Sequence, residues 1–89
     1  MKKSIWKFQL ETVDEQSLLM PKGANILTVQ TQNEIPCLWA LVDPEGNKEE
    51  RIIEIFGAGN PVNDEIDRRY IGTYQSMRGS FIGHVFERQ

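Results

Sequence analysis

The chain has few of the residues on which most site chemistry depends, with a single cysteine, Cys37, and a single histidine, His84, among 89 residues. One cysteine excludes an internal disulfide and favours a reducing compartment, so we expect a cytoplasmic protein. The sequence also lacks the cysteine and histidine spacing of a zinc site. No apolar run approaches the length of a membrane span, so membrane insertion is not expected.

The chain also lacks a strong excess of charge of either sign, because 10 lysines and arginines nearly balance 13 aspartates and glutamates and leave a net charge of −3. The basic residues are scattered along the chain and form no basic stripe. A protein that holds a nucleic-acid backbone needs such a stripe. Nucleic acid is therefore disfavoured as a partner.

Cys37 and His84 are the only pair that thiol nucleophilic catalysis could use. Cys37 lies in an apolar segment, where a thiol is usually an inert small hydrophobe. His84 alternates in phase with Ile82 and Phe86, which is typical of a packed ring. We therefore predict no enzyme activity, no cofactor and no metal site.

The strongest structural signal is the segment 36–42, Pro-Cys-Leu-Trp-Ala-Leu-Val, which is apolar at both alternating positions. A strand with one wet face would alternate, so this pattern predicts a central strand covered on both sides. The residues that follow, Asp43-Pro44-Glu45-Gly46, fit a type I turn.

Alternation and β-branched residues predict further strands on either side of this one. The segment 17–20 is expected to return as the hairpin partner of the first strand. We predict a single all-β domain over residues 1–89, a small antiparallel β-sandwich or partly open barrel of about seven strands. The other predicted strands are 4–11, 17–20, 25–32, 51–56, 69–75 and 81–87.

The last predicted strand, like 36–42, is apolar on both faces: Phe81 and Val85 face one way, Ile82 and Phe86 the other. Two such strands exceed what one small core requires, because sandwich sheets bury only their inner faces. This predicts a homo-oligomer that covers one outer face. The alternative is a tightly curled barrel or a covering loop.

The segment 57–67 has no clear periodicity and is the best candidate for a binding loop. Gly57 and Gly59 follow a strand, but a third glycine is missing and Asn60-Pro61 replaces the start of a helix, which excludes a dinucleotide fingerprint. Two readings stay open: the glycines form a backbone nest for an anion beside Arg68 and Arg69, or they simply release the strand into a loop.

Tyr70, Gly72 and Tyr74 alternate along one predicted strand, and a glycine between two tyrosines leaves a shallow gap for a ring or a partner side chain. Core packing of the tyrosines is the competing interpretation. The predicted binding residues are Gly57, Gly59, Asn60, Arg68, Arg69, Tyr70 and Tyr74.

Five segments of the chain stand out together: Ile5–Phe8, Met20–Ala24 with Ile26–Gln30, Pro36–Val42, Phe56–Gly59 and Tyr70–Tyr74. Together they resemble a family of small uncharacterised proteins encoded by bacteriophages, prophages and bacterial genomes. The resemblance covers nearly the whole chain and carries no catalytic residues. It implies a phage or prophage setting, in which proteins of this size often bind a component of the host.

Two functional hypotheses follow. The first is a non-catalytic, homo-oligomeric binding protein that engages a host protein through a sheet face and the loop from Gly57 to Arg69. The second is a sequestering protein for a nucleotide or another small anionic ligand, held by the glycine loop, Arg68 and Arg69.

Overall fold

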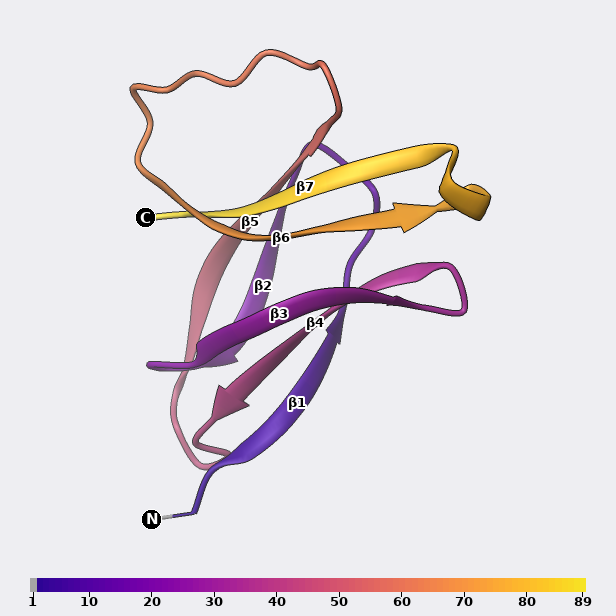
Figure 1. The fold of residues 1–89 in the computed structure, drawn as a ribbon. Helices are drawn as coiled ribbons and strands as arrows, with labels where there is room; N and C mark the ends of the chain where they lie inside the picture. The colour runs from indigo at the N-terminus through magenta and orange to yellow at the C-terminus, as the bar shows by residue number, and fades with distance from the viewer. Residues whose placement is uncertain (1) are drawn as a thin grey trace.

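The structure is a computed structural model that describes residues 2–89. Its strands form two antiparallel sheets that pack face to face as a sandwich (Figure 1). In chain order the elements are β1 Ser4–Gln9, β2 Glu15–Pro21, β3 Asn25–Gln32, β4 Ile35–Val42, β5 Lys48–Gly57, β6 Arg68–Ser76, the 3-10 turn η1 Met77–Gly79 and β7 Phe81–Arg88. The all-β prediction is confirmed, and of its two forms the structure adopts the sandwich.

The predicted central strand lies in the middle of the first sheet, whose order is β1-β4-β3. Its inward residues include Leu38 and Ala40, both with 0% of their surface exposed. The hairpin that joins β3 to β4 turns through Asn33 and Glu34, with φ of 52° and 69°. Two successive residues with positive φ match the right-handed twist of the paired strands.

The second sheet has the order β2-β5-β7-β6. The prediction that β2 pairs with β1 is wrong, because β2 pairs with β5 and β1 pairs with β4. The connection between them crosses from one sheet to the other: Leu10 donates its N–H to the carbonyl of Pro36 in the first sheet, and Asp14 accepts from Ile55 in the second. The side chain of Leu10, in this connection, is buried between the sheets and forms part of the hydrophobic core.

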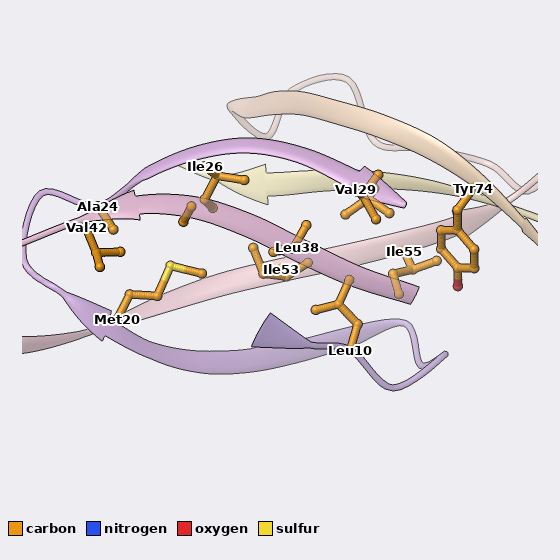
Figure 2. Packing of buried hydrophobic residues seen from close by; sticks show 12 residues of the cluster. Leu10, Met20, Ala24, Ile26, Val29, Leu38, Val42, Ile53, Ile55 and Tyr74 are labelled. Carbon is orange, nitrogen blue, oxygen red and sulfur yellow. The ribbon is translucent and has the colours of Figure 1, made fainter. Parts of the chain in front are cut away.

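One hydrophobic cluster joins the two sheets (Figure 2). It draws on the inward faces of strands from both sheets and on the connection after β1. Burial of this apolar surface is the main favourable term for folding in a chain of this size. Its members are Leu10, Met20, Ala24, Ile26, Val29, Leu38, Ala40, Val42, Ile53, Ile55, Tyr74 and Val85.

The edge strands β3 and β6 lie side by side but belong to different sheets, so the barrel does not close. Both strands carry a bulge, between Ile26 and Thr28 in β3 and between Tyr70 and Gly72 in β6. The contact is close: a Cβ on Gly72 would lie 2.9 Å from the side chain of Val29.

A buried ion pair lies on the inward side of the second sheet. Arg51 on β5 donates through Nε and Nη2 to both carboxylate oxygens of Glu87 on β7, and its Nη1 donates to the carbonyl of Ala24 at 2.9 Å. The hydrogen bond to Glu87 raises the pKa of Arg51 above its ordinary value and outweighs the opposing effect of burial. Arg51 therefore ties the second sheet to the connection that leads into β3, and it does so as a permanently charged group.

Candidate functional site

Three aromatic rings cross the outer face of the second sheet, one on each of three neighbouring strands. Phe56 on β5 meets Phe86 on β7 edge-on, with centroids 5.7 Å apart, and Phe86 meets Tyr70 on β6 at 5.3 Å. Offset and edge-to-face arrangements of this kind are favourable for aromatic pairs. We call Phe56, Phe86 and Tyr70 the aromatic strip.

Tyr70 is the accessible end of the aromatic strip, with 55% of its surface exposed. Its hydroxyl lies 2.5 Å from Oγ1 of Thr73, which lies 2.9 Å from Nδ1 of His84. These contacts hold the tyrosine ring in one orientation on the sheet. A pre-oriented exposed ring loses little conformational freedom when a partner covers it.

Glu54 lies beside the aromatic strip between two arginines. Its carboxylate accepts from Nε of Arg68 at 2.7 Å and from Nη2 of Arg88 at 2.9 Å. Burial raises the pKa of Glu54, but the hydrogen bonds from Arg68 and Arg88 outweigh it and leave the pKa below its usual range. The Arg68 guanidinium also lies 5.1 Å from the centroid of Phe56. Arg68 thus couples the ion cluster to the aromatic strip.

Replacing Glu54 with glutamine is expected to lower the free energy of unfolding at pH 7 by about 1–3 kcal/mol, because two charge-assisted hydrogen bonds weaken. The folded-state pKa of Glu54 is lowered, so its contribution is present above its unfolded pKa of about 4.3 and is lost as the pH falls through the folded value. The gap between wild type and variant, measured by urea unfolding, should therefore close below about pH 4. Glu50→Gln on the same strand is the control, and an E54Q gap as large at pH 3 as at pH 7 would contradict the assignment.

The connection between β5 and β6 arches beyond the end of the second sheet (Figure 1) and borders two hollows on either side of the Phe56–Phe86 pair. The first, of about 340 Å³, includes Phe86 in its lining, and the second, of about 300 Å³, includes Phe56. Carboxylates line both. They are Asp64, Glu65 and Asp67 in the first hollow, and Asp14, Glu15 and Glu54 in the second.

The predicted patch is only partly assembled. Tyr70 points outward, whereas Tyr74 is 3% exposed and points into the core, where its hydroxyl lies 3.0 Å from Oγ1 of Thr12. The prediction that Tyr70, Gly72 and Tyr74 share a face is wrong, because the bulge between Tyr70 and Gly72 reverses the alternation. Gly83 leaves room for the buried ring, since a Cβ there would lie 2.7 Å from Tyr74.

The two predicted arginines also separate. Arg68 turns to the outer face, where it binds Glu54 and the carbonyl of Asn63. Arg69 turns toward the first sheet and donates to the carbonyl of Ile26 at 3.1 Å. They do not converge on the glycine loop.

The predicted loop residues form the turn that leaves β5. Asn60 donates its N–H to the carbonyl of Gly57 at 3.1 Å, and Gly59 has a φ of 86°. Asn60 lines the hollow beside Phe56, and Gly57 and Gly59 line neither of the two hollows described above. This turn therefore sets where the connection begins to arch away from the sheet.

Cys37 and His84 occupy outward positions on opposite sheets of the sandwich, and Cys37 is buried there, with 2% of its surface exposed. Cys37 belongs to β4 and lies opposite Gln9 and Gln30 in the neighbouring strands, while His84 faces outward from β7 beside Thr73. The thiol donates to the carbonyl of Ile35.

No helix among residues 2–89 is both long enough and apolar enough to cross a membrane.

Sequence reasoning missed Phe56, Phe86 and Glu54 as parts of this surface. A usable signal was present, because Glu54 and Phe56 alternate with the buried Ile53 and Ile55 and must face the other way. What the sequence did not show is that β7 lies between β5 and β6, which places Phe86 between Phe56 and Tyr70.

These features define a small all-β sandwich with an aromatic strip on one outer face and carboxylate-lined hollows beside it. The model of a protein family described as a domain of unknown function (DUF7352) matches residues 1–89, so the chain belongs to this family. No curated protein and no solved structure matches the chain.

Proposed function

We propose that this protein is a non-catalytic binding module that engages another protein through the aromatic strip and the connection between β5 and β6. The observation that carries the proposal is the exposure of Tyr70, 55%, at the end of the aromatic strip that crosses the outer face of the second sheet. Tyrosine and arginine are enriched among residues that dominate binding energy at protein interfaces. Tyr70 is the exposed residue of these types on the strip, while Arg68, whose side chain is 7% exposed, supports the strip from below.

The charges around the strip favour a basic partner. Asp64, Glu65 and Asp67 line the first hollow and Asp14 lines the second, while Glu15 and Glu54 of the second hollow are already bound by Arg88 and Arg68. A partner segment with lysine or arginine on either side of an apolar side chain complements this arrangement. In the phage or prophage setting that the sequence resemblance implies, that segment belongs to a cytoplasmic protein of the bacterial host.

Replacing Tyr70 with serine is expected to reduce capture of the partner at least tenfold, because an interface hot spot contributes about 2 kcal/mol or more. The immobilised protein is incubated with bacterial lysate and the retained proteins are quantified by mass spectrometry. Raising the salt to about 1 M should release the partner, since exposed charge pairs are screened.

Leu19→Ser is the matched control, because Leu19 is 64% exposed on the same outer face but on β2, at the far edge of the sheet from Tyr70. Both variants should melt at the temperature of the wild type. A retained protein that Tyr70→Ser and Leu19→Ser bind equally well would contradict the proposed surface.

A further inference from the structure

The outer face of the first sheet is almost free of charge. Its side chains come from the outward positions of β1, β4 and β3, and Lys7 is the only charged residue among them. The Lys7 ammonium is already bound to Oε1 of Gln32 at 2.7 Å. We call this surface the neutral face; its outward residues are Ile5, Lys7, Gln9, Asn25, Thr28, Gln30, Gln32, Ile35, Cys37, Trp39 and Leu41, with Leu27 in the β3 bulge.

Apolar side chains on the neutral face are exposed. Ile5 is 60% exposed, Leu27 46% and Ile35 41%, and Trp39 on the central strand is only partly buried. Ile5 pairs across the strands with Leu41, so these two apolar groups lie together at one end of the face, whereas Ile35 lies at the other end beside Gln32. The other end carries amides, in the row Gln9, Cys37 and Gln30.

The two outer faces differ in their charge, and this difference decides which kind of partner each face can bind. The neutral face has no carboxylate among its outward residues, while the opposite outer face carries Glu15, Glu50 and Glu54. Two copies of a chain with net charge −3 repel each other least where neither presents a carboxylate. A basic partner, in contrast, gains nothing from the neutral face.

The size of the neutral face sets how strong an association it can support. Three strands about 4.8 Å apart, β1 with 6 residues and β3 and β4 with 8 each, cover at most roughly 14 by 25 Å. A standard stable interface buries about 800 Å² on each partner, and the footprint of this face is less than half of that area. The face therefore supports only a weak and reversible dimer. Overlap about a twofold axis of the two ends that carry Ile5 and Leu41 leaves the amides at the rim, together with Ile35, and so gives an apolar core with a mostly polar rim.

We infer that two copies of this chain associate through the neutral face about a twofold axis. The dimer stacks four sheets, with the two β1-β4-β3 sheets in contact at the centre. Both aromatic strips then face outward on opposite sides of the dimer. If the proposed function holds, the dimer is bivalent, and a partner that presents two sites is bound more tightly than one strip allows. The dimer itself does not depend on that function.

The test is sedimentation velocity of the whole chain from about 10 μM to about 1 mM, the range in which a weak dimer changes population. The wild type should shift from monomer toward dimer as concentration rises. Ile5→Asp should weaken dimerisation at least tenfold, because it places two carboxylates in the centre of a neutral contact.

Leu19→Asp is the control, since it makes the same change at a similarly exposed leucine on the opposite outer face and should dimerise like the wild type. Melting curves check that both variants fold. A wild type that stays monomeric at about 1 mM overturns the inference, whatever else the face is found to bind. So does a dimer that Leu19→Asp disrupts as strongly as Ile5→Asp.

Discussion

Replacing Glu87 with alanine is expected to lower the free energy of unfolding by about 3–5 kcal/mol. Glu87 is 4% exposed and supplies both acceptor oxygens to the guanidinium of Arg51, whose side chain is 15% exposed. Removing the carboxylate leaves a buried cation that cannot shed its charge near neutral pH and whose remaining carboxylate neighbour, Glu49 at 3.6 Å, is 38% exposed. In a domain whose total stability is about 5–15 kcal/mol, the melting temperature should fall by more than about 10 °C.

The double variant Arg51→Met/Glu87→Leu separates this explanation from a simple loss of packing. If the damage in Glu87→Ala comes from a buried charge that has lost its buried partner, removing both charges should recover a large part of the stability. Glu50→Ala on the exposed side of β5 should change stability by less than about 0.5 kcal/mol. A double variant as unstable as Glu87→Ala in urea unfolding would show that the ion pair is not the cause.

Local patterns were sufficient to predict the strands and the turns between them. The segment 36–42 is extended in the middle of its sheet. The turn after it closes as its residue types require: Gly46 donates its N–H to the carbonyl of Asp43 at 3.0 Å, and Glu45 donates its N–H to the side chain of Asp43 at 3.1 Å. These features depend on neighbours within a few residues. Patterns of this range are visible in a single sequence.

The facing of Tyr74 could not be predicted in the same way. One extra residue at the bulge in β6 changes which side every later residue faces. The bulge lies where Gly72 meets Val29 of the other sheet, a contact between segments far apart in the chain. Alternation alone therefore places Tyr70 and Tyr74 together, although the fold separates them.

The ion pairs that shape the site were hidden for a related reason. Arg68 is 14 residues from Glu54, and Arg51 is 36 residues from Glu87. Adjacent basic residues such as Arg68 and Arg69 resemble one patch in the sequence, yet successive side chains of a strand point to opposite faces. Their partners are set by strand order, which a single sequence did not reveal.

Replacing Leu38 with alanine is expected to lower the free energy of unfolding by about 2–5 kcal/mol. Leu38 is 0% exposed on the central strand and belongs to the cluster that joins the two sheets (Figure 2). Its truncation removes apolar contacts and leaves a cavity at a position held from both sides by neighbouring strands, β1 and β3. Such a position has little freedom to collapse around the lost side chain, which places the expected cost in the upper part of the range.

Leu19→Ala makes the same chemical change at a leucine that is 64% exposed, so it should cost less than about 1 kcal/mol. The two losses in free energy of unfolding are measured by urea unfolding, with the dependence on urea concentration unchanged between variants. Their difference separates the effect of burial from the intrinsic strand preferences of leucine and alanine. If Leu38→Ala cost no more than Leu19→Ala, β4 would not be the strand on which the core is built. The neutral face and the aromatic strip would then lack the common scaffold that holds them on opposite sides of one sandwich.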